Sequence, residues 1–366
     1  MKNSRILFMS LLFIYSLTGC NSPNDKAGEK KEKIQVGVIA PLSGENSYYG
    51  EILKNGFDLA FANDSNYSLK YEDSKFTQIG SISAINKLIS TDKIKVLLGE
   101  VTSGNTMAIA PIAEKNKAIL FATIASADTL RYYGDYIFRN MPGNKVQGIT
   151  AANFLYNDLN IKSVAVLGQN SEYGKNITKS FKNQFTKLGG SIKFDDSYLE
   201  GDKDFKTPLL KIKQSGAQAL FIPGNENEPA VILKQAKELN LKIPIIGGDG
   251  SSTDNLIKIA GNSSEGFYCT NVLVDKSTDY YKKYRSSYFS KFNKEPGAYD
   301  AYAYEGAVII LEALKSVGND PDKIKKYLYS HTFQSMTGDL NFDKDGEVNR
   351  FWGIYQVVKG KFVEIK

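Results

Sequence analysis

Short apolar runs and longer amphipathic stretches alternate along most of this chain. Each short run of three to seven mainly apolar residues predicts a buried strand, and each longer stretch with apolar residues at helical spacing predicts a helix. The predicted strands lie at 34–40, 69–73, 96–98, 118–122, 163–168, 192–194, 219–223, 243–247 and 352–358. The predicted helices lie at 49–60, 78–90, 145–158, 175–188, 279–292 and 299–316, with another opening at Thr106. This alternation indicates parallel sheets that are covered by helices on both faces.

The strand and helix rhythm restarts near 141–144, so the pattern divides into two successive α/β halves. A chain of 366 residues is long enough for two such halves, each with its own core. We therefore expect two lobes that face a cleft. In sheets of this type, ligands bind beyond the carboxyl ends of the strands.

A turn of small polar residues follows the third predicted strand. Thr102, Ser103, Gly104 and Asn105 lie between that strand and the helix that we expect to open at Thr106. The first N–H groups of a helix lack intrahelical partners, and the dipole there attracts negative charge. The turn is thus a candidate carboxylate site. The alternative is an ordinary strand–helix turn in which Ser or Asn caps the helix.

The first twenty residues have the features of an export signal. Lys2 and Arg5 precede twelve largely apolar residues, 6–17, a run too short to span a membrane. The sequence Leu17-Thr-Gly-Cys20 that follows resembles the bacterial lipoprotein signal, in which the cysteine is lipidated. We expect a signal peptide at 1–19, lipidation at Cys20 and a flexible tether at 20–33, which contains no large apolar side chain. The alternative is a plain secretory signal with an incidental cysteine.

The composition excludes several classes of site. The chain has one His and two Cys, so a His or Cys metal site is not expected, and Cys269 is predicted to be a buried, inert thiol. Removing 1–19 lowers the net charge only from +6 to +4, with no Arg-rich block, so nucleic-acid binding is not expected. Asp343-Lys-Asp-Gly starts like a calcium loop but lacks the distal Glu, and we interpret it as a hairpin turn. We expect no metal and no cofactor.

Seven motifs carry a family resemblance, and they occur in order along the chain. They are Pro41-Leu-Ser-Gly with Tyr49-Gly50, Tyr71-Glu-Asp-Ser, Gly99-Glu-Val-Thr-Ser, Glu172-Tyr-Gly, Gly247-Gly-Asp-Gly, Ala298-Tyr-Asp-Ala-Tyr and Gly338-Asp-Leu-Asn-Phe-Asp-Lys-Asp-Gly. The region 34–358 resembles the type I periplasmic solute-binding proteins of the branched-chain amino acid (Leu/Ile/Val-binding) family. The resemblance implies two doubly wound parallel-sheet lobes joined by a three-strand hinge. Lobe 1 would contain 34–141 and 271–350, and lobe 2 would contain 142–270 and 351–366.

The resemblance also implies how the head group of an amino acid would be held. Ser103 would bind the carboxylate through its hydroxyl and backbone N–H, and Ala125 would offer its carbonyl to the ammonium. Ser126 would replace a family threonine that touches both charged groups, although the 123–128 loop is one residue shorter than usual. Asp249 would pair with the ammonium from lobe 2. The alternative for Asp249 is a cap on the turn before Ser251.

Aromatic and polar positions complete the implied pocket. Tyr49, Tyr173 and Tyr299 match aromatic positions that line it, although Tyr173 could instead be a rim residue that packs on Gly174. The main departure is Asn225, which stands where leucine-binding members have a tyrosine. An amide there suits a polar ligand side chain better than an apolar one.

The implied function is capture and delivery of a small solute. We expect a monomeric, lipid-anchored protein in the periplasm or on the cell surface that passes an amino acid to an ABC transporter permease by hinge closure. The alternative is a sensing module that presents a small amide, urea or aromatic acid to a membrane receptor. An enzyme is disfavoured because the sequence has no phosphate loop, nucleotide fingerprint or His-based catalytic set.

Overall fold

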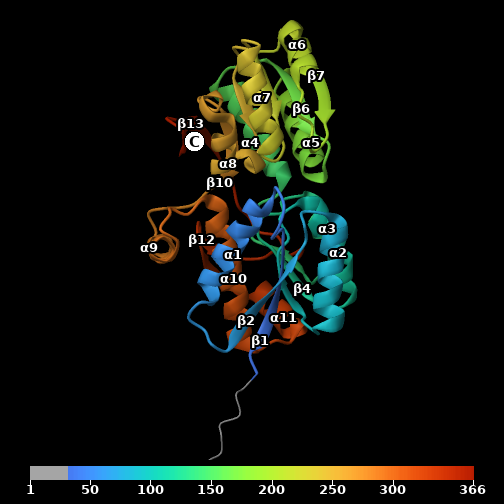
Figure 1. Cartoon of the computed structure of the whole chain (residues 1–366), viewed down its shortest axis with the longest axis vertical. Helices are drawn as coiled ribbons and strands as arrows, with labels where there is room; N and C mark the ends of the chain where they lie inside the picture. The colour runs from blue at the N-terminus through green and yellow to red at the C-terminus, as the bar shows by residue number, and fades with distance from the viewer. Residues whose placement is uncertain (1–31) are drawn as a thin grey trace, which may run out of the picture. The chain divides into compact units, whose positions relative to one another are not determined.

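The computed structural model describes residues 32–366, and Lys33–Lys366 form one compact unit. Two sheets dominate this unit, and Figure 1 shows their elements as two groups. The predicted signal peptide, Cys20 and all but the last two residues of the predicted tether lie outside the described residues. No helix in the part of the chain that the structure describes is long and apolar enough to span a bilayer.

The first sheet contains five parallel strands in the order β2-β1-β3-β4-β5. Its strands are β1 (Ile34–Ala40), β2 (Tyr67–Asp73), β3 (Val96–Leu98), β4 (Ile119–Ala122) and β5 (Ile137–Arg139). The helical segments around it are α1 (Ser47–Phe61), α2 (Gln78–Asn86), η1 (Lys87–Thr91), α3 (Ser103–Lys115), η2 (Asp128–Tyr132), α9 (Asp279–Phe292), α10 (Ala298–Val317) and α11 (Pro321–Ser330). The short hairpin of β11 (Phe333–Ser335) and β12 (Gly338–Leu340) follows α11.

Alternate side chains of the first sheet enter two different cores, as the sequence pattern requires. Val38 and Phe121 pack with α1 and α10 on one face. Ile39 and Leu120 pack with α2, η1 and α3 on the other. Both faces are therefore covered, and the strands consist of consecutive apolar residues for that reason.

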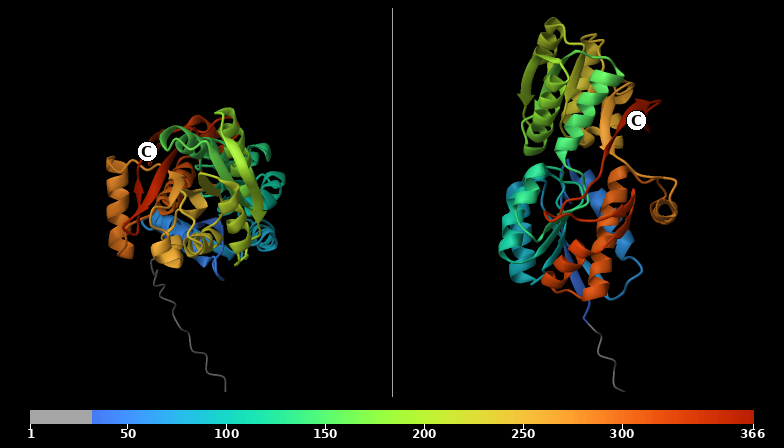
Figure 2. Two further views of the ribbon diagram at one scale, coloured as in Figure 1. Left: turned by 90° about the horizontal axis from the view of Figure 1, so that it is seen from above. Right: turned by 180° about the vertical axis from the view of Figure 1, so that it is seen from behind.

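The second sheet has seven strands in the order β14-β13-β10-β9-β8-β6-β7. Its strands are β6 (Ser163–Gln169), β7 (Ser191–Tyr198), β8 (Ala219–Ile222), β9 (Ile245–Gly247), β10 (Tyr268–Val272), β13 (Trp352–Val358) and β14 (Lys361–Glu364). Its helical segments are α4 (Asn144–Asn153), η3 (Phe154–Asp158), α5 (Glu172–Lys187), α6 (Lys206–Ser215), α7 (Asn227–Glu238), η4 (Asp249–Ser251), α8 (Asp254–Ala260) and η5 (Gly261–Ser263). Val166 and Phe221 pack with α4 and α5, whereas Leu167 and Leu220 pack with α6 and α7. Figure 2 shows these layers from two further directions.

The expected α/β architecture of two doubly wound sheets is confirmed, with one difference at an edge. β6 to β10 are parallel, but β13 pairs antiparallel with β10, and β14 pairs antiparallel with β13. The tight turn at Lys359 and Gly360 accounts for the second pairing, because two strands joined by such a turn must run antiparallel. Helices α6, α7, α8 and α11 and strands β5, β10, β11, β12 and β14 were not predicted from the pattern.

Two helices start earlier than the sequence pattern predicts. Helix α3 begins at Ser103 rather than Thr106, and Thr102 is its cap. Helix α5 begins at Glu172 rather than 175, and the hydroxyl of Ser171 caps it by accepting the N–H of Gly174. In both cases a hydroxyl residue supplies the cap, and the polar first turn conceals the start of the helix in a hydrophobic pattern.

Buried ion pairs lie close to two of the three predicted hinge segments. Near 141–144, Arg139 pairs with Glu347. Near 349–352, Arg350 donates to both carboxylate oxygens of Glu305, at 2.8 and 2.9 Å. The third predicted segment, 270–272, forms the end of β10. The lobe boundaries and the hinge itself remain predictions.

Candidate ligand-binding site

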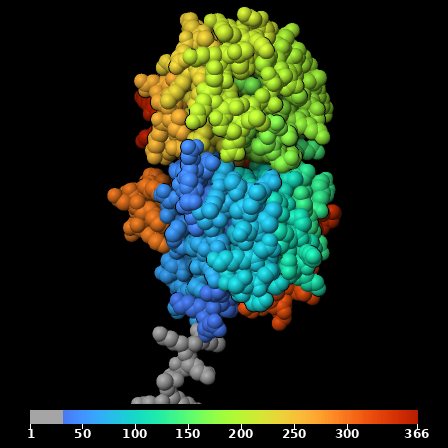
Figure 3. Space-filling model, turned by 45° about the vertical axis from the view of Figure 1, so that its right-hand side comes forward, coloured from blue at the N-terminus to red at the C-terminus, as the bar shows by residue number. Residues whose placement is uncertain are grey.

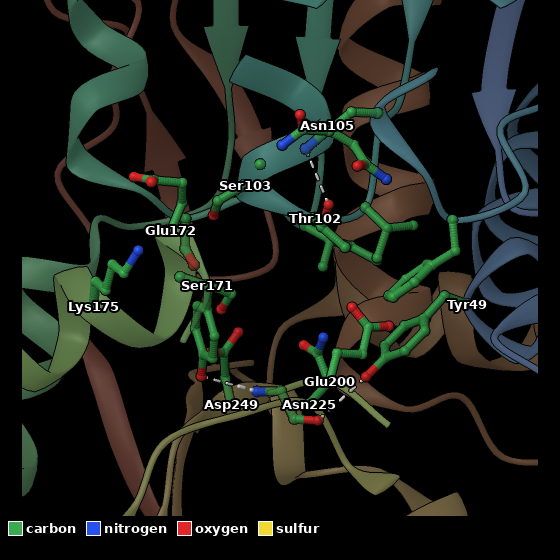
Figure 4. A pocket seen from close by; sticks show the side chains of 18 of the residues that line it. Tyr49, Thr102, Ser103, Asn105, Ser171, Glu172, Lys175, Glu200, Asn225 and Asp249 are labelled. Atoms are coloured by element: carbon green, nitrogen blue, oxygen red, sulfur yellow. Dashed lines mark hydrogen bonds between the residues drawn. The ribbon is translucent and has the colours of Figure 1, made fainter. Parts of the chain in front are cut away.

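A cavity of about 320 Å³ lies among loops that follow the strands of both sheets. Seven of the eight residues predicted to bind ligand line it: Tyr49, Ser103, Ser126, Tyr173, Asn225, Asp249 and Tyr299. Figure 4 shows several of them around the cavity, and Figure 3 shows the surface formed by the two groups of elements. Ala125 is buried and is not among the lining residues. Its predicted contact with a ligand stays a prediction.

Ser103 is the first residue of α3 and faces this cavity. The Thr102 hydroxyl caps the helix by accepting the N–H of Asn105 at 3.1 Å, so the cap is Thr102 and not the Ser or Asn of the alternative interpretation. The carboxylate site stays a prediction. Ser103 Oγ accepts the N–H of Ala127 at 3.1 Å, which leaves its proton available for donation. The N–H groups of Ser103 and Gly104, in the first helical turn, have no intrahelical acceptor. Ser103 therefore offers donors to an anion.

Glu100, which the sequence analysis did not assign, takes up part of the same turn. Its buried carboxylate accepts the N–H groups of Val101 and Thr102, at 2.6 and 3.1 Å, and the hydroxyl of Ser74. Burial raises the pKa of Glu100. Glu100 thus occupies the N–H groups that precede helix α3. The backbone donors that remain for a ligand are those of Ser103 and Gly104.

Asp249 follows β9 and is 2% exposed. One carboxylate oxygen accepts the amide of Gln147 at 2.6 Å and the hydroxyl of Tyr173 at 2.7 Å. The other accepts the hydroxyl of Tyr299 at 2.6 Å. The side chain is therefore not a cap on the turn before Ser251, which was the alternative interpretation. Burial raises the pKa of Asp249, because these neutral donors offset desolvation only in part.

The motifs Tyr49-Gly50 and Tyr173-Gly174 bring the starts of α1 and α5 close to the ends of strands in the same way. A Cβ on Gly50 would lie 1.9 Å from the carbonyl oxygen of Pro41, and one on Gly174 would lie 2.1 Å from that of Gln169. Each glycine thus lets a helix approach the backbone at the end of a strand. The adjacent residues Tyr49 and Tyr173 are thereby directed into the same cavity. Tyr173 is 8% exposed, so it is not the rim residue of the alternative interpretation.

Tyr49 also connects elements of the two sheets. Its hydroxyl donates to the carboxylate of Glu226, which precedes α7, and lies 3.2 Å from the carbonyl oxygen of Gly250. Its ring stacks on Phe76, with centroids 5.8 Å apart and planes inclined by 13°. Burial and the nearby Glu226 carboxylate raise the pKa of Tyr49, which keeps the phenol protonated as a donor.

Ser126 and Asn225 present polar atoms to the cavity. Ser126 is 2% exposed and lines the cavity. Asn225 is half-buried and also lines it. A hydroxyl and an amide can each donate and accept hydrogen bonds, so both side chains can serve a polar ligand.

Several lining residues were missed by sequence reasoning. They include Phe76, Gln78, Glu172, Lys175 and Glu200. Their positions lie on loops and helix starts whose approach to one another depends on both sheets. Glu172 alone carried a signal, since it stands in the Glu172-Tyr-Gly motif, but only its tyrosine was assigned.

Comparison with known proteins gives this cavity a family context. Residues 33–361 match the family model described as periplasmic binding protein. The leucine-, isoleucine-, valine-, threonine- and alanine-binding protein of Pseudomonas aeruginosa is 25% identical over 87% of this chain and 88% of its own length. The Leu/Ile/Val-binding protein homolog 2 of Brucella abortus is 28% identical over 86% of this chain and 87% of its own.

Solved structures give the same result. The leucine-binding protein LivK of Thermotoga maritima has a TM-score of 0.87 at 27% identity, over 91% of this chain and 98% of that one. A benzoate-binding solute receptor of Rhodopseudomonas palustris has a TM-score of 0.84 at 20% identity, over 91% and 95%, and shows the fold alone. Members of this family bind solutes outside the cytoplasm, work with ABC transporters and are not enzymes. The chain therefore belongs to the type I periplasmic binding proteins of the branched-chain amino acid (Leu/Ile/Val-binding) family.

Proposed function

We propose that this protein captures an α-amino acid in the cavity between the two sheets and delivers it to an ABC importer. The observation that carries the proposal is the pairing of Ser103 and Asp249 in one cavity. Ser103 offers hydrogen-bond donors at a helix start, and Asp249 offers a buried carboxylate. A zwitterion has the complementary pair of charges. The relatives named for leucine, isoleucine and valine support the same ligand class.

The head group would be bound by groups that are already oriented. The ligand carboxylate would accept hydrogen bonds from the Ser103 hydroxyl and the N–H groups of Ser103 and Gly104, and Ser126 would contact both charged groups. Each hydrogen bond to a charged group is worth about 1.5–3 kcal/mol. The ligand ammonium would donate to Asp249, which lies within 4 Å of no Lys, Arg or His in residues 32–366. The ammonium would also donate to the carbonyl of Ala125.

Closure would couple binding to delivery. Tyr49 and Tyr299 belong to helices beside the first sheet, and their hydroxyls bond Glu226 and Asp249 beside the second. A ligand that contacts both sides favours the closed state by its differential affinity for that state. In this proposal the lobes are 34–141 with 271–350 and 142–270 with 351–366. The hinge is formed by the three chain crossings between them.

We also propose that Cys20 carries a lipid that holds the protein at the cell envelope. The tether would then keep the binding protein close to its permease. Replacing Cys20 with Ala should release the protein from the membrane fraction, and mass spectrometry of the wild-type N-terminus should find the added acyl chains. Retention of the Cys20→Ala variant at the membrane would contradict the anchor.

A thermal-shift screen tests the ligand class. The segment 21–366 is titrated with the twenty amino acids, urea, short amides and aromatic acids. A ligand at 100 times its dissociation constant should add about 2.7 kcal/mol of stability, which raises the melting temperature. An amino-acid response that is lost in Ser103→Ala and Asp249→Asn supports the head-group assignment. A response to non-zwitterions alone, such as benzoate, refutes it and leaves the fold unaffected.

A further inference from the structure

We propose that the ligand carries an additional positive charge on its side chain, as in an amino acid with a terminal ammonium or guanidinium group. This inference rests on the proposed function and narrows its ligand class. It departs from the aliphatic ligands after which the relatives are named. The reasons are the charge of the cavity, the groups at its rim and the lack, within residues 32–366, of a basic group within 4 Å of the buried carboxylates beside it.

The charged residues that line the cavity are mainly acidic. Glu172, Glu200 and Asp249 are carboxylates, and Lys175 is the one basic lining residue within the described chain, which gives a net charge of −2. An ordinary zwitterion is neutral and leaves this charge unchanged. A ligand with one extra positive charge reduces the negative charge of the occupied cavity by one. Opposite charges interact more strongly in a cleft of low polarity than in water.

Two further buried carboxylates stand behind the lining residues. Glu226 is 1% exposed and accepts the hydroxyl of Tyr49, and Glu228 is 4% exposed and accepts the N–H of Gly201 at 2.8 Å. Neither lies within 4 Å of a Lys, Arg or His anywhere in residues 32–366. Burying a carboxylate without a cation is costly. Both accept hydrogen bonds only from neutral donors, so a cation in the cavity would favour their charged forms.

The rim beside Tyr49 supplies direct partners for a cationic side chain. Figure 4 shows Glu200, Asn225 and Tyr49 on the side of the cavity away from Glu172 and Lys175. Partial burial alone raises the pKa of Glu200, and no hydrogen bond or neighbouring charge within the described residues contributes to the shift. The stacked rings of Tyr49 and Phe76 offer π faces, which attract ammonium and guanidinium groups. Glu200 is solvent-exposed, so a long side chain could reach it with its charged end.

Ser126 also lines the cavity and is a buried residue, 2% exposed. It belongs to the head-group side of the proposed site. The charge of the ligand side chain is inferred instead from the acidic lining residues and from Glu200, which lies on the same side of the cavity as Tyr49.

Matched ligands test the inference. Isothermal titration calorimetry of segment 21–366 compares arginine with its neutral isostere citrulline, and lysine with norleucine. Leucine and cadaverine complete the set. We expect arginine or lysine to bind at least about tenfold more tightly than its neutral counterpart, with a preference that shrinks as salt is added. Tighter binding of leucine or norleucine would overturn the inference.

A pair of variants locates the partner of the side chain. Glu200→Gln should lower the preference for the cationic ligand about three- to tenfold and leave the affinity for the neutral isostere nearly unchanged. Glu172→Gln removes the same charge from the other side of the cavity and should have a smaller effect. Equal effects of the two variants would contradict the role of Glu200.

The two proposals fail in different ways. If leucine binds more tightly than arginine and lysine and its binding requires Ser103 and Asp249, the proposed function stands and the charge inference is wrong. If cadaverine binds and amino acids do not, the cation inference stands and the head-group assignment is wrong. If neither cationic nor aliphatic amino acids nor cadaverine bind, both are wrong.

Discussion

Two groups of buried carboxylates in this protein have opposite electrostatic surroundings. Glu305 and Glu347, near the predicted hinge segments, are each bonded to a buried arginine, Arg350 and Arg139 respectively. Glu226, Glu228 and Asp249, at or beside the cavity, lie within 4 Å of no basic side chain in residues 32–366. We call these the paired and the unpaired carboxylates.

The presence or absence of a basic partner indicates whether a buried carboxylate has a structural role or is available to a ligand. A buried ion pair loses much of its stabilisation to desolvation, but removing one partner leaves a charge that water cannot reach. The paired carboxylates therefore hold chain segments together and need nothing from outside. The unpaired carboxylates are bonded only by neutral donors and still favour a cation. In the proposed function that cation is the ammonium of the ligand.

The largest expected effect comes from breaking a paired carboxylate. Arg350→Ala leaves Glu305, which is 0% exposed, without its cation. We expect a loss of about 3–5 kcal/mol in the free energy of unfolding, measured by urea denaturation. Lys206→Ala, which removes an exposed pair with Glu238, is the control and should cost less than about 1 kcal/mol. A similar small loss for Arg350→Ala would mean that the pair is dispensable.

The next largest effect is expected on ligand affinity, when an unpaired carboxylate is replaced. Asp249→Asn should weaken amino-acid binding by about ten- to a hundredfold, the equivalent of one lost charged hydrogen bond. Because Asp249 has no cationic partner within residues 32–366, stability without ligand should fall much less than in Arg350→Ala. Calorimetry and urea denaturation measure the two quantities. Unchanged affinity would remove Asp249 from the site.

The pH dependence of stability should reflect carboxylates that lack a cation. Burial raises the pKa of Asp300 from 3.8 to about 6, and burial also raises those of Asp249 and Glu226. An acid with a raised folded-state pKa binds more protons when folded, so stability falls as pH rises. For Asp300 this loss of stability occurs between about pH 4 and about pH 6. The free energy of unfolding changes there by up to about 1.4 kcal/mol per pH unit.

Thermal melts of the ligand-free protein across that window measure the slope. Asp300→Asn should flatten it between pH 4 and 6 without changing ligand affinity, since Asp300 does not line the cavity. A slope that is the same in the variant would show that other groups dominate the titration.

The smallest effect is expected for an exposed ion pair. Lys294 and Glu51 lie 2.8 Å apart, and both side chains are largely solvated. Lys294→Ala should change the free energy of unfolding by about 0–1 kcal/mol, less at high salt. Denaturation at two salt concentrations checks this. A loss above 2 kcal/mol would show that exposure is a poor guide to the value of these pairs.

Much of the fold could be predicted from the sequence because both sheets are covered on both faces. Consecutive apolar residues such as those of β3 and β4 identify buried strands without long-range information. The tyrosine-rich helix α9 has the bounds that the pattern predicts. The pattern failed for α6 and α7, whose many lysines and glutamates obscure a narrow apolar face, and for the antiparallel strand β14.

The candidate site was predictable only where a motif marks a position. Tyr49, Tyr173 and Asp249 each stand in a short motif next to a glycine, and all three line the cavity. Gln147 and Glu200 stand in none of the motifs, and Glu100 stands in Gly99-Glu-Val-Thr-Ser, of which only Ser103 was assigned to the site. Gln147 donates a hydrogen bond to Asp249, which lies 102 residues further along the chain. Glu100 accepts a backbone N–H group that precedes α3. Glu200 lines the cavity.

The sequence by itself determined the α/β class, the positions of most strands along the chain and the family. These depend on local periodicity and on motifs that occur in a fixed order along the chain. Only the tertiary structure decided which donors remain at Ser103 and which buried acids have a cation. A carboxylate in a sequence is one negative charge. Whether that charge is neutralised depends on groups far away in the chain, as with Arg139 and Glu347, or on a ligand.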